Sequence, residues 1–182
     1  MVLAVLAVVV LLGIFLVAMY NSLVQLRVRS ESAWSDIDVQ LKRRHDLVPN
    51  LVETVKGYAI HEKSTFEDIA KLRSMAMQAT GPVDKAAAEN QLTGALKSLF
   101  AVAENYPQLQ ASQEFTQLQN SLSEIEDAIQ NARRYYNAVV RDLNTKVQTF
   151  PTNIVAGMFH VQQRQFFDIT EPTQREPVAV KF

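Results

Sequence analysis

The first part of the chain is apolar and carries no charge. The segment MVLAVLAVVVLLGIFLVAMYNSLVQLR has no charged side chain before Arg27, and its strongly apolar part extends from Val2 to Tyr20. A helix of that length reaches across a hydrocarbon core of about 30 Å. Tyr20 and Asn21 then fall where aromatic side chains mark the membrane–water interface. The pattern predicts a membrane-spanning anchor, assigned to residues 1–25.

A cleaved signal peptide is the alternative interpretation of this segment. Signal peptides begin with basic residues and end in a cleavage site with small side chains at the key positions. Here no Lys or Arg precedes the apolar run, LVAMYNS lacks the small side chains, and the chain has no cysteine for lipid attachment. We therefore expect an uncleaved anchor.

Beyond the anchor, apolar residues recur at multiples of three and four. The stripe consists of Leu26, Trp34, Ile37, Leu41, Val48, Val52, Val55 and Ala59. An average spacing near 3.6 predicts one amphipathic helix, which continues the anchor as a single rod. Pro49 lies inside this helix, and because proline removes a backbone hydrogen bond, we expect a kink near His45.

Three further helices follow from the same periodicity. Ser64 and Glu67 form a capping-box pattern that predicts a helix starting there and ending near residue 79. The next predicted helix spans residues 82–106 and ends before Pro107. The last has the most regular stripe: Phe115, Leu118, Leu122, Ile125, Ile129, Ala132, Tyr136, Val139 and Leu143. Such alternating steps are typical of a coiled coil or a four-helix bundle.

Long helices joined by short turns pack as antiparallel neighbours. The predicted fold class is therefore all-α, with an N-terminal transmembrane helix that continues into a long helix of an antiparallel four-helix bundle. We assign residues 26–149 to the bundle and residues 150–182 to a C-terminal tail that is first apolar and then proline-containing. The final EPTQREPVAVKF is expected to be extended.

Composition narrows the chemistry that the chain can perform. The net charge is -1, there is no cysteine, and the three histidines include no His-x-x-x-His pair. Thiol catalysis and cysteine-ligated zinc are excluded, and a histidine zinc site would need distant parts of the chain. We expect no catalytic residues, cofactor or metal. Nucleic acid is not expected as a partner either, since ARRYYN is a single basic and aromatic patch inside a patterned helix.

The stretch AWSDIDVQLKRRHDLVPNLVETV is nevertheless dense in residue types used for catalysis. On one helix Asp36 and Asp38 are two positions apart, so they point to different faces and form no carboxylate pair. Asp38, Lys42 and Asp46 are four apart, which predicts a ladder of exposed ion pairs. The remaining charges are assigned to the same solvated surface: Arg43, Arg44 and Glu53. The stretch is interpreted as a charged helix face, without catalytic function.

His45 falls on the apolar stripe between Leu41 and Val48. It is either a buried titrating group near the proline kink or a half-exposed side chain at the edge of the bundle, and we favour the second interpretation. Trp34 serves either as a core anchor or as part of an interface. The apolar tail packs on the bundle, on the membrane or on a neighbouring subunit. The candidate interface residues are Trp34, His45, Phe150, Ile154, Phe159, Phe166 and Phe167.

Five motifs occur along the chain in a fixed order: YNSLVQLR, AWSDIDVQLKRRHDLVPNLVETVKGYAIHE, AENYPQL, RRYYNAVV and FPTNIVA followed by FF. With these motifs the chain resembles the LemA family of bacterial membrane proteins over nearly its whole length. The resemblance implies a single-pass anchor followed by an antiparallel helical bundle, with no accepted catalytic residues and no cofactor. Some members lie near genes for membrane metalloproteases, which implies a partnership with such a protease.

We therefore expect a non-enzymatic single-pass protein whose bundle self-assembles into a scaffold or homo-oligomer on the lipid bilayer. The alternative is an adaptor or accessory subunit of a membrane protease. The basic residues nearest the anchor, Arg27 and Arg29, follow it in the sequence. The positive-inside rule then places the bundle in the cytoplasm, at the bacterial inner membrane, with the periplasm as the alternative.

Overall fold

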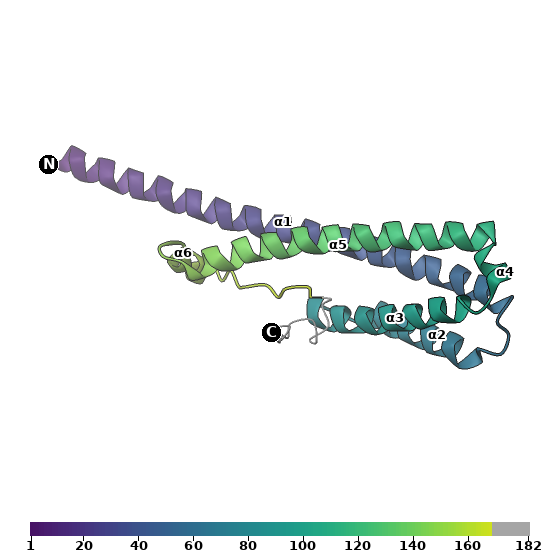
Figure 1. Ribbon diagram of the computed structural model, residues 1–182. Helices are drawn as coiled ribbons and strands as arrows, with labels where there is room; N and C mark the ends of the chain where they lie inside the picture. The colour runs from purple at the N-terminus through teal and green to yellow at the C-terminus, as the bar shows by residue number, and fades with distance from the viewer. Residues whose placement is uncertain (169–182) are drawn as a thin grey trace, which may run out of the picture. The chain divides into compact units, whose positions relative to one another are not determined.

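The computed structural model describes residues 1–168 of the 182-residue chain, and these residues contain helices and no strand. The helices of this part are α1 (Val2–Lys56), α2 (Lys63–Gln78), α3 (Pro82–Ala103), α4 (Pro107–Gln110), α5 (Gln113–Gln148) and α6 (Thr152–Met158) (Figure 1). The all-α prediction is confirmed. The extended conformation predicted for EPTQREPVAVKF concerns residues outside the described part.

The long first helix is also confirmed. α1 contains 55 residues and continues through Pro49 without interruption. Its apolar side chains are exposed from Met1 to Val17. Among residues 1–168, α1 is the helix that is long and apolar enough to cross a membrane. An apolar surface of this extent is not stable in water, so it fits the predicted anchor.

The helix ends differ in part from the expectations. The predicted capping box is wrong: α2 begins at Lys63 after Glu62 in the N-cap position, so Ser64 lies inside the helix, and no side chain caps its start. α3 begins at Pro82, where the missing N–H of proline is not needed. The preceding Gly81 has φ of 80°, a conformation that glycine adopts without strain. α3 ends at Ala103, before the predicted end at residue 106, because Pro107 starts the short helix α4.

The chain divides into two compact units, each of which combines segments that are far apart in the sequence. Unit 1 comprises residues 1–37 and 131–166. It therefore contains the first part of α1, the last part of α5, and α6. Unit 2 comprises residues 38–130 and the described residues 167–168. The predicted domains, 1–25, 26–149 and 150–182, are each contiguous in the sequence. The two units instead each contain part of α1 and part of α5.

Each unit has its own apolar core. In unit 2 α2 and α3 lie side by side, and the core includes Val48, Leu51, Val55, Ile69, Leu92, Leu99 and Leu122 (Figure 1). In unit 1 a smaller cluster joins α1, α5 and α6: Leu23, Leu143, Val155 and Ala156. The predicted stripe of α5 is buried, with only Leu118 and Ala132 partly exposed. The antiparallel four-helix arrangement stays a prediction.

Candidate functional site

The interior of unit 2 contains charged side chains. Arg44 on α1 is 1 % exposed, and Glu89 on α3 is 0 % exposed. Nη1 of Arg44 donates to Oε2 of Glu89 at 3.1 Å, and Nη2 donates to Oγ1 of Thr93 at 2.6 Å. Nε of Arg44 lies 3.1 Å from Oε1 of Glu126 on α5. One guanidinium group is therefore held between two carboxylates.

His45 belongs to the same cluster. Its Nε2 lies 2.7 Å from Oε1 of Glu89, and its backbone oxygen accepts a 2.7 Å hydrogen bond from Nε of Arg73 on α2. Each of the two Glu89 oxygens thus has a cationic or polar partner from α1. We call Arg44, His45, Glu89, Thr93 and Glu126 the buried ion-pair network. It links α1, α3 and α5, and Arg73 adds α2.

The solvated position expected for Arg44 is wrong, and so is the half-exposed position expected for His45. Both follow Leu41 at helical spacing and lie on the buried face of α1. Glu89 lies three positions before Leu92 on the buried face of α3. Burying one isolated charge is costly, but opposite charges from two helices offset much of this penalty.

Glu126 is the more exposed carboxylate of the network. Burial raises its pKa above the usual range, although the charge of Arg44 acts in the opposite direction. The Nε–H of Arg44 has no well-aligned hydrogen-bond acceptor among residues 1–168, so the contact with Glu126 is ionic rather than a directed hydrogen bond. This explains why Arg44 does not outweigh the burial of Glu126.

The network is built as a structural element. Apart from the Nε–H of Arg44, its buried polar groups bond to one another, as buried ion pairs require. Within residues 1–168, no group of three or more His, Cys, Asp or Glu side chains could hold a metal ion. These residues therefore join helices together in the interior of unit 2.

The exposed charges of the same helix behave mostly as expected. Lys42 pairs with Asp46 at 2.7 Å, and this hydrogen bond lowers the pKa of Asp46. Glu53 pairs with Lys56 at 3.2 Å. Asp38 differs from the predicted ladder, because it pairs with Lys85 of α3 at 2.5 Å.

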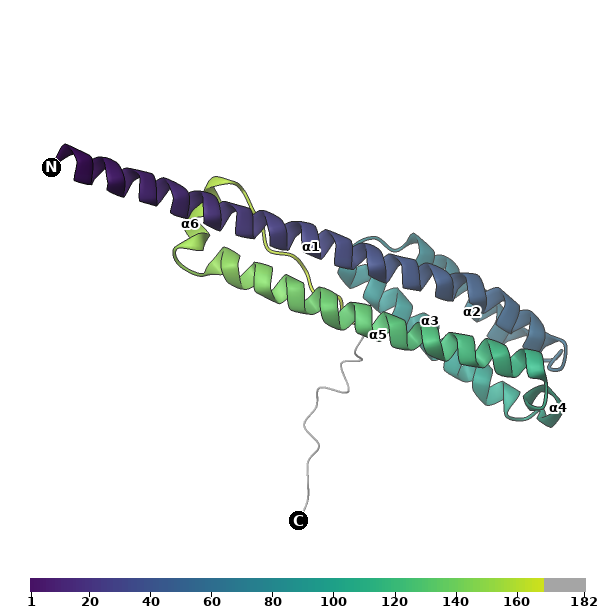
Figure 2. The same cartoon turned by 90° about the horizontal axis from the view of Figure 1, so that it is seen from above.

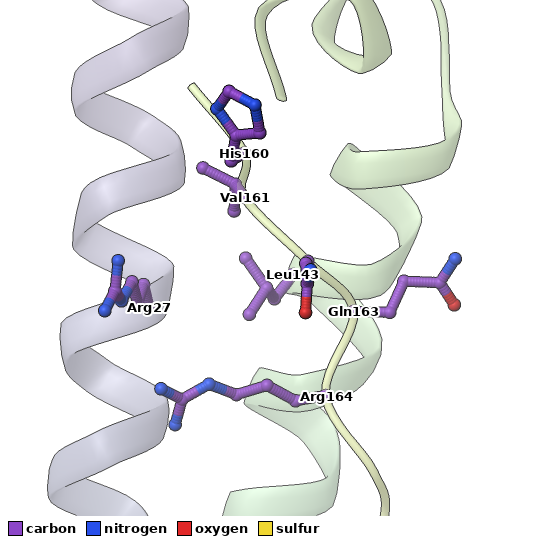
Figure 3. A pocket seen from close by; sticks show the side chains of 7 residues that line it. Arg27, Leu143, His160, Val161, Gln163 and Arg164 are labelled. Atoms are coloured by element: carbon purple, nitrogen blue, oxygen red, sulfur yellow. The ribbon is translucent and has the colours of Figure 1, made fainter. Parts of the chain in front are cut away.

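Unit 1 holds charged residues at its surface instead. Arg27 on α1, Leu143 on α5 and the segment from His160 to Arg164 line a pocket of about 270 Å³ (Figure 3). We call it the basic pocket. The Arg164 side chain extends toward α1, and its Nη2 donates to Oε1 of Glu31 at 2.6 Å. Nε of Arg27 donates to the same oxygen at 3.2 Å. These contacts lower the pKa of Glu31, with the Arg27 hydrogen bond as the largest cause.

Side chains of α5 hold the segment that carries Arg164. Asn144 donates from Nδ2 to the backbone oxygen of Arg164 and accepts from its backbone N–H, both at 2.9 Å. The buried Tyr136 hydroxyl donates to the backbone oxygen of Gln165 at 2.9 Å. Burial raises the pKa of Tyr136. These bonds satisfy backbone groups that have no regular secondary structure of their own.

The structure separates the candidate interface residues into three groups by exposure. Trp34 is partly buried, with its ring centroid 5.4 Å from that of Tyr136. His45 and Phe167 are buried, which differs from the exposure that an interface requires. The others are exposed: Phe150, Ile154, Phe159 and Phe166. Met158, which the sequence interpretation did not select, is exposed beside them on α6. The tail residues Val155 and Ala156 pack back on unit 1, as one of the expected alternatives has it.

Comparison with known proteins identifies relatives over most of the chain. The sequence profile of the LemA family matches residues 33–182. Protein LemA of Metamycoplasma hominis is 30 % identical over 155 residues, which cover 83 % of this chain and 69 % of that protein. Magnetosome protein MamQ 2 of Paramagnetospirillum magneticum is 27 % identical over 193 residues, covering 92 % of this chain and 71 % of that protein. Magnetosome protein MamQ of Magnetospirillum gryphiswaldense is 24 % identical over 174 residues, covering 81 % of this chain and 64 % of that protein.

Proposed function

We propose that this chain, which belongs to the LemA family, is a non-enzymatic single-pass membrane protein that self-assembles on the bilayer through the outward face of α1. Family membership and the apolar first part of α1 support a membrane-associated helical protein. The names of the family and of its relatives are not enzyme names, which is indirect support for a non-enzymatic role.

The exposed face of α1 in unit 1 carries the proposal. Val10, Val17 and Val28 are 52–58 % exposed. The exposed polar residues on the same face are uncharged: Asn21, Ser32 and Ser35. At 3.6 residues per turn, all six side chains point within about 60° of one another. A helix face directed to water normally carries charged residues, so this uncharged face indicates a protein contact.

The side chains on this face suit close packing of one helix on another. Serine is small enough to let two helix backbones approach, and the valines contribute van der Waals packing, which together are how helices associate in membranes. The face begins inside the expected anchor and continues past Tyr20. Two copies could therefore pair along the span and its extension without a change in register.

The particle mass of the full-length protein, extracted together with native lipid, tests self-assembly. We expect a uniform homo-oligomer for the wild type and a shift toward monomer for Val28→Glu, because two carboxylates would face each other at the contact. Val83→Glu is the matched control, since Val83 is similarly exposed on α3. A wild-type monomer would contradict the proposal. A one-to-one complex with another membrane protein would instead favour the adaptor role.

We also propose that the helices beyond the anchor lie in the cytoplasm at the bacterial inner membrane, as the positive-inside rule indicates. The chain has no cysteine, so a single Ser123→Cys substitution provides a unique label on the exposed face of α5. A membrane-impermeant maleimide should modify it only after the inner membrane is opened. Modification with an intact inner membrane would place this part in the periplasm.

A further inference from the structure

Large apolar side chains are exposed where unit 1 turns from α5 into α6. Phe150, Ile154, Met158 and Phe159 are 54–80 % exposed. We call these four residues the α6 patch. Single exposed apolar residues are common, but four large ones on one short segment mark a contact surface.

The α6 patch lies beside the end of the anchor. The ring centroids of Phe159 and Tyr20 are 4.4 Å apart. Val155 and Ala156, on the opposite side of α6, pack with Leu23 of α1. Figure 2 shows α6 alongside α1 at this level. The patch is therefore adjacent to the residue expected at the membrane–water interface, and it continues the apolar surface of the anchor.

Basic side chains follow the patch on the side away from the anchor. His160 comes directly after Phe159 and lines the basic pocket, and Arg164 lines it further along the segment. Arg27 lies seven residues beyond Tyr20, about 10 Å along the helix at 1.5 Å per residue. Lys146 donates a hydrogen bond to the hydroxyl of Ser22, close to the same level.

The basic pocket has more positive than negative charge. Two guanidinium groups, those of Arg27 and Arg164, share the single carboxylate of Glu31. Each guanidinium group has five N–H donors, and within residues 1–168 the bonds to Glu31 use one donor of each group. Arginine donors in this arrangement suit a phosphate group, which accepts two parallel hydrogen bonds.

We propose that the α6 patch inserts into the bilayer surface beside the anchor, and that the basic pocket binds the headgroup phosphate of an anionic phospholipid. The order of side chains along α1 and α6 matches the order of layers in a membrane. Apolar and aromatic residues come first, at the acyl boundary. Long cationic side chains come next and reach back to the phosphate layer. This second attachment involves a surface different from the outward face of α1, so it does not depend on self-assembly.

Depth-dependent quenching tests insertion of the α6 patch. Trp34 is the only tryptophan, so Trp34→Phe combined with Phe150→Trp gives one fluorophore in the patch of the full-length chain. In nanodiscs of phosphatidylglycerol and phosphatidylcholine, brominated acyl chains should quench this fluorophore. The control is Ile60→Trp in the same background, at an exposed position of unit 2. We expect at least a two-fold larger loss of emission at position 150.

Two results would overturn insertion. Equal quenching at positions 150 and 60 would show that the patch stays in water. Blue-shifted emission at position 150 without quenching by brominated lipid would show that protein, such as a second copy of this chain, covers the patch. Ile154→Trp provides a second fluorophore if the Phe150 substitution disturbs folding, which circular dichroism would reveal.

Lipid retention tests the basic pocket. We expect native mass spectrometry of the full chain to show bound phosphatidylglycerol, reduced several-fold by Arg164→Gln and by His160→Gln. Arg134→Gln is the matched control, because Arg134 is exposed on α5 and bonds only locally to Asn131 among the described residues. Equal retention in all variants would overturn the headgroup site. Saturation by inorganic phosphate, without preference for phosphatidylglycerol over phosphatidylcholine, would also overturn it, since the pocket would then bind free phosphate.

Discussion

Both units pair arginine with glutamate, but in opposite proportions and in opposite surroundings. In unit 2 the buried Arg44 lies between two carboxylates, Glu89 and Glu126. In unit 1 the carboxylate of Glu31 lies between two arginines, Arg27 and Arg164, at the surface. In the interior the charge of Arg44 must have a partner of opposite sign, because an unpaired buried charge is costly. The surface group can keep excess positive charge, since water solvates it, and so it stays available to a ligand.

The largest expected effect comes from breaking the buried pair. Glu89→Ala leaves the charge of Arg44 in the interior without its fully buried carboxylate partner, and removing one member of a buried pair costs about 3–5 kcal/mol. Chemical denaturation of the full chain in detergent, followed by circular dichroism, measures this loss. Arg44→Met added to a Glu89→Leu variant should recover most of it, because both charges are then absent. A Glu89→Ala variant as stable as the wild type would contradict the structural role of the network.

A smaller effect is expected in unit 1 from Asn144→Ala. The substitution removes both hydrogen bonds to the backbone of Arg164 and leaves partly buried groups unsatisfied, which costs about 1–3 kcal/mol. Hydrogen exchange should increase locally, over residues 161–166, while the core of unit 2 stays protected. Asn131→Ala is the control, because this asparagine is exposed on the same helix. Increased hydrogen exchange throughout both units would show that the two units unfold cooperatively, which would contradict a local effect.

The charge of Glu126 should make stability depend on pH. A glutamate in the unfolded chain titrates near 4.5, and burial raises the folded value. Between these two pKa values the folded state binds more protons than the unfolded state, so the free energy of unfolding falls as pH rises. Glu126→Gln removes this contribution. We expect the melting temperature of the variant, measured relative to that of the wild type, to increase as pH rises above 4.5. A constant difference would contradict the raised pKa.

The smallest effect is expected from Asp46→Asn, on the same helix as Arg44. Its pair with Lys42 is exposed, and such pairs contribute little because water competes for both charges. Differential scanning calorimetry should give a melting temperature close to that of the wild type. A loss of stability as large as that of Glu89→Ala would show that exposed and buried ion pairs contribute equally in this protein.

Periodicity alone predicts much of the fold. The continuous helix α1, the approximate extents of α2 and α3, and the buried stripe of α5 follow from the spacing of apolar residues. The buried ion-pair network was missed because Arg44 was assigned to the solvated surface that carries the ladder of Asp38, Lys42 and Asp46, since charged side chains are mostly exposed. The sequence did contain a sign of their burial, since Arg44 and Glu89 each occupy a position on the apolar stripe of a helix. Their pairing joins residues 45 positions apart, which no helical period encodes.

The chain end shows a different limit of pattern analysis. Phe150, Ile154 and Phe159 were recognised as contact residues, but α6 is too short for a period to define which side chains face inward. Its inner face depends on Leu23 and Leu143, which come from two distant helices. The basic pocket likewise depends on backbone bonds from Asn144 to Arg164, and these follow from tertiary packing.

The division of the chain also sets an order for its synthesis. Residues 1–37 leave the ribosome first, but their partners in unit 1 begin at Asn131. At 5–20 residues per second, translating the intervening segment takes roughly 5 to 20 seconds. During that time Leu23 and Leu26 have no α5 or α6 to cover them, whereas the contiguous residues 38–130 of unit 2 can already fold. The core of unit 2 can therefore form before unit 1 is completed, so the part of the fold built from contiguous residues comes first.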